Sequence, residues 1–400
     1  PAPAPAPAEP WECDAREATR IALVTDAAGL DAALSGAAGA PGFKPEYAHQ
    51  LFGQEEQISG YRGLRVRLVL HAFTGHAFAS VTWAERRPGA DDVLGTLREA
   101  FPAGLETDRA RFAQQLGALT AASGALPPCA EPLGEEEGAG GVEASVVRLP
   151  LSDPSVRAWH ARFEPLLLFF IDGASAIDAG DGKWELLAAV ERVEGRSPPL
   201  SLAGFCTAYR FYCWPDRERL RLSQVLVLPP AQRRGHGARL LGAVRALAAR
   251  LGAADVTVED PTDQLQRLRD CCDVRVLLAG GPAGAAADAA VAAALAAAPR
   301  GLDAQVAALQ PPAEVCSFAR DELKVCRAQA RKAWEVVLFL RARAGGLRAA
   351  AAAAPAFKEL VRRRLRGSNA DARSEAKGKR LIDTEGGFLL LKHGAAAAAM

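Results

Sequence analysis

The chain has 400 residues and a formal net charge of +1, with 50% of its residues apolar and 24% charged. The near-neutral balance excludes a global field that would recruit nucleic acid, and the length predicts two or three domains with sizeable cores. The eight cysteines form no CxxC pair and match no zinc spacing, so we expect reduced thiols and no metal. Outside weakly apolar alanine tracts, no stretch is apolar and long enough to predict a membrane span.

The first third of the chain predicts a mixed α/β domain. Residues 1–10 repeat proline and alanine, which indicates an extended tail and not a signal peptide. Apolar and polar residues alternate over 64–71, so we expect a half-buried strand there, with a partner strand over 77–85. Asp92 is placed to open a short helix. The segment 124–141, rich in Gly, Pro and Glu, is predicted to be a loop or linker.

The middle of the chain predicts one helix followed by three antiparallel strands. Asp153 and Pro154 are typical of a helix start, as capping carboxylate and first-turn proline. Pro165 falls inside this helix and should kink it. The strands are expected over 184–193, 202–214 and 220–228, with Pro-rich connections between them.

A strand, a glycine loop, a helix and a second strand follow one another over 220–259. The run Val225–Leu228 predicts a strand buried on both faces and ended by two prolines. Apolar spacing over 238–251 predicts an amphipathic helix. In the strand expected over 255–259, Val256 and Val258 should face one way, and the polar residues the other.

The C-terminal part differs in composition. Residues 281–298 are almost all alanine and glycine, which we interpret as an insertion without site chemistry. Helices are predicted over 322–343 and 357–366. The basic clusters Arg362–Arg364 and 377–380 suggest either a nuclear localisation signal or solvated helix faces.

The glycine loop has the properties of a phosphate site. Gly235 and Gly237 let backbone N–H groups approach a ligand at the start of a helix, where the dipole favours an anion. A plain glycine-containing turn is the alternative. A P-loop is excluded because no Gly-Lys-Ser/Thr follows, and a dinucleotide fingerprint fails because Leu240 replaces its third glycine.

These residues resemble a known family. The pattern Gln232-x-x-Gly235-x-Gly237 is similar to the acetyl-CoA pyrophosphate loop of the GNAT acetyltransferases. Further segments resemble the catalytic subunit of type B histone acetyltransferases, over roughly residues 11–340. They are Pro45-Glu46-Tyr47, His49–Gly53, Gly60–Leu64, Ser223-Gln224, Glu259-Asp260-Pro261 and Leu268-Arg269-Asp270.

The resemblance implies an α/β (α+β) protein with a central GNAT fold between a mixed α/β N-terminal domain and a small helical C-terminal domain. We expect a Pro-Ala tail over 1–10 and a histone-tail-contacting domain over 11–145. The acetyltransferase core should cover 146–275. The Ala/Gly-rich insert is assigned to 276–310, and the helical domain with its basic tail to 311–400.

The implied function is acetyl transfer from acetyl-CoA to lysines of newly synthesised histones, chiefly the H-four N-terminal tail. The family works with a WD-repeat histone-binding chaperone in nucleus and cytoplasm, so we expect this partner and this location, without direct nucleic-acid or membrane binding. Two alternatives stay open: a histone carrier that has lost turnover, and a GNAT enzyme acting on other proteins or small-molecule amines.

The resemblance also implies roles for individual residues. Acetyl-CoA contacts fall on Val225, Leu226, Val227, Gln232, Arg233, Arg234, Gly235, His236, Gly237 and Ala238. Histone-tail contacts fall on Gln54, Glu55, Glu56, Asp172, Trp184, Tyr209, Arg210 and Phe211. His236 is interpreted as a spacer between the two glycines of the loop. Tyr212 and Trp214, in contrast, are predicted to be ordinary sheet core.

The candidate general base is Glu259, with Asp260 as an auxiliary. A lysine with a pKa of about 10.4 must lose a proton before it attacks the thioester, and a carboxylate is suited to remove it. Alternation places Glu259 on the polar face of its strand, whereas Asp260 should point to the other face. Asp172 is one methylene shorter than the family's usual glutamate, so we do not expect it to act as a base.

Overall fold

The computed structural model describes residues 11–36, 39–134, 137–139, 141–195, 199–279 and 281–368. The predicted tail over 1–10 and the basic cluster over 377–380 lie outside the described residues. Two compact units are present. The first comprises residues 1–209 and 222–243, and the second comprises 210–221 and 244–400.

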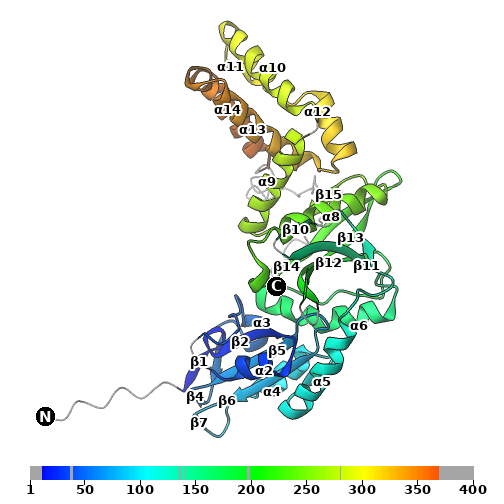
Figure 1. The fold of residues 1–400 in the computed structure, drawn as a ribbon. Helices are drawn as coiled ribbons and strands as arrows, with labels where there is room; N and C mark the ends of the chain where they lie inside the picture. The colour runs from blue at the N-terminus through cyan, green and yellow to red at the C-terminus, as the bar shows by residue number, and fades with distance from the viewer. Residues whose placement is uncertain are drawn as a thin grey trace, which may run out of the picture. The chain divides into compact units, whose positions relative to one another are not determined.

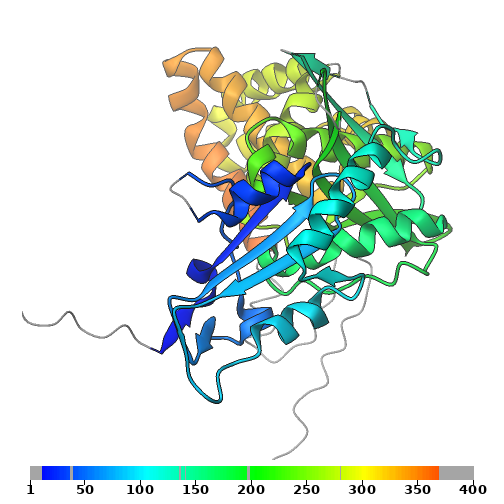
Figure 2. The ribbon, with the colours of Figure 1, turned by 60° about the horizontal axis from the view of Figure 1, so that its bottom comes forward.

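The first unit opens with a four-stranded sheet of order β2-β5-β6-β8, whose strands lie side by side in Figure 2 (blue to light blue). These strands are β2 (Thr19–Val24), β5 (Arg65–His71), β6 (Ala77–Thr82) and β8 (Leu105–Glu106). The predicted pairing of the strand over 64–71 with the strand over 77–85 is confirmed, because β5 and β6 are antiparallel with Leu68 opposite Ala79. There are also two small two-stranded sheets. In one, β1 (Glu12–Asp14) pairs with β3 (Gln57–Ser59), and in the other, β4 (Tyr61–Arg62) pairs with β7 (Glu85–Arg86).

Short helices connect these strands. They are α1 (Ala15–Ala18), α2 (Ala27–Leu34), α3 (His49–Phe52), α4 (Val93–Ala100) and α5 (Arg109–Ala122). The predicted start of α4 is confirmed, since the Asp92 side chain accepts a hydrogen bond from the backbone N–H of Gly95 at 2.9 Å. Asp108 caps α5 in the same way.

A second, seven-stranded sheet has the order β10-β11-β12-β13-β14-β15, with β9 pairing with β11. Its strands are β9 (Glu131–Pro132), β10 (Glu137–Ala139), β11 (Val142–Leu149), β12 (Trp184–Val193), β13 (Leu200–Cys213), β14 (Arg217–Val227) and β15 (Val256–Val258). The three strands predicted over 184–228 are confirmed. The prediction that 124–141 is a loop is wrong where β9 and β10 pair with β11.

β13 and β14 approach each other closely at one glycine. A Cβ at Gly204 would lie 2.5 Å from the carbonyl oxygen of Leu226, closer than van der Waals contact allows. The β12–β13 register also shifts between Ala189 and Val190. Gly204 therefore permits the backbone approach that places the end of β14.

The kinked helix is confirmed. α6 (Pro154–Phe163) starts after Asp153, whose side chain accepts from the Ser155 N–H at 2.8 Å. A 3₁₀ turn over Glu164–Leu166, containing Pro165, separates α6 from α7 (Leu167–Phe170). The apolar sides of these helices pack into the core of the first unit, with Phe163, Phe169, Phe205 and Leu226 among its buried residues.

The second unit is mainly helical, and Figure 1 shows α10, α11, α13 and α14 packed together. α8 (His236–Arg250) runs into it from the first unit. Its other helices are α9 (Asp263–Ala279), α10 (Ala283–Ala296), α11 (Leu302–Ala308), α12 (Ala313–Ser317), α13 (Arg327–Ala344) and α14 (Leu347–Ser368). Shorter turns cover Ala298–Arg300 and Phe318–Glu322 in this unit, and Pro229–Ala231 in the first.

The alanine-rich stretch, which we interpreted as an insertion, forms α10, and Ala287 and Ala294 lie fully buried in the core of the unit. Two predictions for the C-terminal part need correction. The helix expected from 322 begins at Arg327, because Lys324 has a positive φ of 55° that interrupts it. α14 starts ten residues before the predicted 357, since alanines favour helix up to and across Pro355.

Three histidines of the first unit are fully or partly buried. Burial lowers the pKa of His71, His76 and His160 from the usual 6.5 to about 4 in each case. His71 and His160 are at most 1% exposed. The His160 ring meets Phe205 edge-on, with 6.0 Å between centroids, and its Nε2 has no hydrogen-bond partner among the described residues. All three imidazoles are therefore neutral in the folded protein at neutral pH.

Folding stability should fall as the pH is lowered from about 6.5 to about 4. In this range the unfolded chain protonates each histidine while the folded protein leaves them neutral, so acid favours unfolding. His160→Leu should remove up to about 1.4 kcal/mol per pH unit from this slope. Urea unfolding of both proteins across the range measures it, and identical slopes would show that His160 is not held neutral by the fold.

Candidate functional site

The candidate site begins at the last residues of β14. Their burial alternates: Leu226 is 4% exposed and belongs to the core, whereas Val225 and Val227 are half-buried. The prediction of a strand buried on both faces is therefore wrong. Only one face of β14 packs on the core here, and the face carrying Val225 and Val227 is partly open.

The loop after β14 has an unusual backbone. Pro229–Ala231 form one 3₁₀ turn, and the Gln232 side chain then donates from Nε2 to the Val227 carbonyl oxygen at 3.1 Å. Arg233 has a φ of 62° and Gly235 a φ of 87°. Gly235 suits this left-handed conformation because it lacks a Cβ. The glycine predicted from the motif is thus required by the shape of the loop.

α8 begins within the motif, at His236. The first N–H groups of a helix have no partner inside it, so those of His236, Gly237 and Ala238 are available at its N-terminal end. Arg233 and Arg234 are exposed beside this end. Backbone donors, the positive end of the helix dipole and two guanidinium groups together form a site suited to a phosphate group.

A buried carboxylate that we did not predict holds this loop. One oxygen of Glu191, Oε1, lies 2.6 Å from Nε2 of His236 and 2.9 Å from Nη2 of Arg234. His236 is 1% exposed and Glu191 is 7% exposed. Burial lowers the pKa of His236, against the opposing effect of Glu191, so the neutral ring donates its Nε2–H to the carboxylate. The interpretation of His236 as a spacer is wrong, because it connects the loop to β12.

Tyr209 and Trp184, two of the predicted substrate contacts, lie together. Their rings meet edge-to-face at a centroid distance of 4.9 Å. The Tyr209 hydroxyl donates to Asp181 Oδ2 at 2.8 Å, and this hydrogen bond raises the pKa of Tyr209. The buried Gln224 donates to the Ser175 carbonyl at 2.7 Å. The segment between α7 and β12 is thereby tied to β13 and β14.

His49 lies between two acidic residues that were predicted to contact the histone tail. Its Nε2 lies 3.1 Å from Asp172 and its Nδ1 lies 3.7 Å from Glu56. Glu56 also pairs with Arg16 at 2.8 Å and accepts from the Ala48 N–H, so it serves the structure of its turn. Asp172 is 73% exposed.

The remaining predicted residues fall into two groups. Gln54 and Glu55 are exposed in the turn that follows α3. Arg210 and Phe211 belong to the second unit, where Arg210 lies 3.6 Å from Glu218 and Phe211 stacks under Arg221. These two contacts lie within the β13–β14 hairpin.

The two candidate bases also belong to the second unit and follow β15. Glu259 and Asp260 are both exposed. Asp260 has a positive φ of 30°, so the backbone turns there and strand alternation does not extend to it. Within β15, Val256 and Thr257 are both buried, so both faces of this short strand are covered. Because the backbone turns at Asp260, strand alternation does not predict whether the side chains of Glu259 and Asp260 point to different faces.

Two aromatic residues near the end of the β13–β14 hairpin are exposed. Tyr212 is 59% exposed and Trp214 is 82% exposed. The prediction that they are sheet core is wrong, since β13 extends past the core before it turns. Among the described residues, no group of three or more His, Cys, Asp and Glu side chains could hold a metal ion. No single helix in the described ranges is long and apolar enough to cross a membrane.

Known proteins are similar to this chain over most of its length. A family described as the histone acetyl transferase HAT1 N-terminus matches residues 11–172. The type B catalytic subunit of histone acetyltransferase from Arabidopsis thaliana is 28% identical over 309 residues, covering 74% of this chain and 66% of that protein. The human subunit is 31% identical over 245 residues, covering 57% of each.

A solved structure of an aminoglycoside acetyltransferase, from an uncultured soil metagenomic sample and in complex with sisomicin, was also found. It is 18% identical, covers 32% of this chain and 86% of that one, and has a TM-score of 0.24, too low to carry an argument. The chain spans 57% to 66% of the length of the curated relatives it matches. Residues 11–172 match the histone acetyltransferase N-terminal family, and the chain is similar over most of its length to type B histone acetyltransferase catalytic subunits.

Proposed function

We propose that this chain is an acetyl-CoA-dependent lysine acetyltransferase that acts on newly synthesised histones, chiefly on the H-four N-terminal tail. The observation that carries the proposal is the loop between β14 and α8, whose backbone donors and arginines are suited to a phosphate group, in a chain similar to histone acetyltransferases. Acetyl-CoA supplies the acetyl thioester, and the loop would hold its pyrophosphate.

The cofactor side of the site is organised by the strand and the loop. The partly open face of β14 at Val225 and Val227 would lie along the pantetheine arm, and its backbone groups would orient the thioester. The Val227 carbonyl oxygen accepts a hydrogen bond from the Gln232 side chain, which links the end of the strand to the loop. The Leu226 N–H is our candidate donor to the oxyanion that forms on the acetyl carbonyl.

The substrate side offers the groups that a lysine-rich tail requires. Glu55 and Asp172 are exposed carboxylates that would attract a basic peptide. The ring pair of Trp184 and Tyr209 presents aromatic surface to a lysine stem and its ammonium. Glu56 is occupied by Arg16 and His49, so we assign it to positioning the turn that presents Glu55.

Glu259 is our candidate for the base that removes the proton from the lysine ammonium. It is exposed at the end of β15, and it occupies the position that the resemblance assigns to the catalytic glutamate. Asp260 follows in a left-handed turn before Pro261 and is assigned an auxiliary role. The lysine nitrogen would then attack the thioester carbonyl, and coenzyme A would leave as the thiol after taking up a proton.

The partner and the location are proposed together. A WD-repeat histone-binding chaperone would present the histone, in nucleus and cytoplasm. The arginines once considered as a localisation signal are engaged in ion pairs: Arg362 with Glu359, Arg363 with Asp303 and Glu359, and Arg364 with Glu335. These pairs favour a structural role for the cluster within α14.

Glu191→Gln should weaken acetyl-CoA binding without changing the chemical step. The variant keeps the shape of the side chain but loses the charge that holds Arg234 and His236, so the loop becomes less well fixed. We expect the KM for acetyl-CoA to rise roughly tenfold, about 1.4 kcal/mol, with kcat nearly unchanged. Glu194→Gln, an exposed position one residue beyond β12, is the matched control. A KM within twofold of wild type would show that the carboxylate does not anchor the loop.

Glu259→Gln should abolish most acetyl transfer to a histone H-four tail peptide. General-base catalysis supplies about 10²–10⁴-fold, so kcat at neutral pH should fall within that range and recover partly at high pH. Radiolabelled acetyl-CoA in a filter assay measures the transfer, with a Lys→Arg peptide as blank. Asp260→Asn is the companion variant and should retain most turnover. The assignment fails if Asp260→Asn is inactive while Glu259→Gln is not, and a wild-type chain without turnover would favour the histone carrier.

A further inference from the structure

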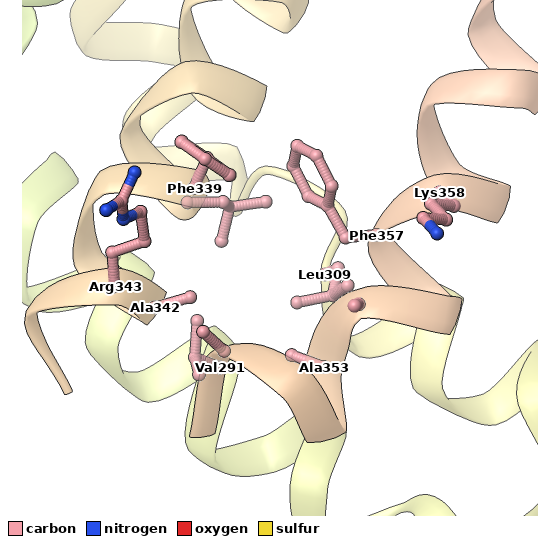
Figure 3. Close-up of a pocket in the computed structure, with 11 residues that line it drawn as sticks. Val291, Leu309, Phe339, Ala342, Arg343, Ala353, Phe357 and Lys358 are labelled. Carbon is pink, nitrogen blue, oxygen red and sulfur yellow. The ribbon is translucent and has the colours of Figure 1, made fainter. Parts of the chain in front are cut away.

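The helical second unit contains an apolar cavity of about 240 Å³ between α13 and α14. Figure 3 shows Phe339 and Phe357 near each other along one side of it, and their ring centroids lie 6.0 Å apart. Val291 of α10 and Leu309, which directly follows α11, also line the cavity. The Trp334 indole donates to the Leu309 carbonyl at 2.9 Å, so this part of the wall is fixed.

The cavity exists because the part of α14 that lines it ahead of Phe357 carries only alanine side chains. Ala350, Ala353 and Ala354 follow each other at helical spacing and line it together. Protein interiors are otherwise close-packed, and a void lined by apolar groups stays poorly hydrated. At roughly 30 Å³ for a group of the size of a water molecule, the space holds about eight methylene-sized groups.

Two cations stand at the rim of this apolar space. Arg343 and Lys358 line the cavity, and Figure 3 shows them at two sides of it. Both are exposed, and the Arg343 guanidinium lies 5.7 Å from the centroid of the Phe339 ring. Neither has a carboxylate partner within the described residues, whereas Arg341 on the same helix as Arg343 pairs with Asp288.

We propose that the cavity binds a medium-chain fatty acid, with the alkyl chain against the phenylalanines and alanines and the carboxylate at the rim, paired with Arg343 or with Lys358. The cavity volume and its apolar lining suit an unbranched chain, and the two rim cations select an anionic head over a neutral or cationic one. This site lies within the second unit and does not depend on acetyl transfer, so the proposal stands or falls separately from the proposed function.

Isothermal titration of the full chain with decanoate, decanol and decylamine tests the head-group selection. We expect one decanoate per chain, bound at least tenfold more tightly than either of the other two probes. Equal affinity for decanoate and decylamine, or no saturable decanoate binding, would overturn the proposal.

Two sets of variants test the location. Ala353→Leu fills the cavity and should lower decanoate affinity at least tenfold, whereas Ala352→Leu, exposed on the same helix, should bind like wild type. The double variant Arg343→Glu with Lys358→Glu keeps the cavity and should reverse the preference toward decylamine. Its control is Arg348→Glu, which is exposed and away from the lining. Wild-type decanoate binding in both the filled and the charge-reversed proteins would place the fatty acid elsewhere.

Discussion

A single buried carboxylate, Glu191, determines the shape of the site on which the proposed chemistry depends. One of its oxygens accepts from both His236 and Arg234, so strand β12 and the start of α8 are joined through the loop. A buried carboxylate is costly when unpaired, and a loop with left-handed residues at Arg233 and Gly235 is strained when unsupported. Each therefore stabilises the other, and the helix N-terminus is held with its donors free for a phosphate group.

Proton removal by the candidate base Glu259 depends on a different part of the chain. β14 enters the loop held by Glu191 and α8 leaves it, and both elements also run into the second unit, where β15 carries Glu259 at its end. At its other end β15 is fixed by the pairing of Arg219 with Asp255 at 2.6 Å and by the bond from the Leu220 N–H to the Asp255 carbonyl. The candidate base thus follows a short, well-anchored strand, whereas Asp260 lies in a turn with a positive φ.

Local signals in the sequence were sufficient for the framework and insufficient for the contacts between distant segments. Asp153, Pro165 and the Gln-x-x-Gly-x-Gly loop act on their own neighbours, so the helix start, the kink and the turn were predictable. Glu191 was not, because its role depends on the strand register that places it against a loop 45 residues later. The exposure of Trp214 depends on how far β13 extends past the core, and low complexity concealed the strong helix propensity of the alanine stretches in α10 and α14.

Calorimetric titration of coenzyme A into the full chain tests the central claim most directly. Gly237→Glu places a side chain and a negative charge among the free N–H groups at the start of α8. Gly242→Glu is the control, since it makes the same change on the same helix where a new side chain meets only open space. The account predicts that Gly237→Glu weakens coenzyme A binding at least tenfold while Gly242→Glu binds like the unmodified chain. Equal affinity in all three proteins would contradict it.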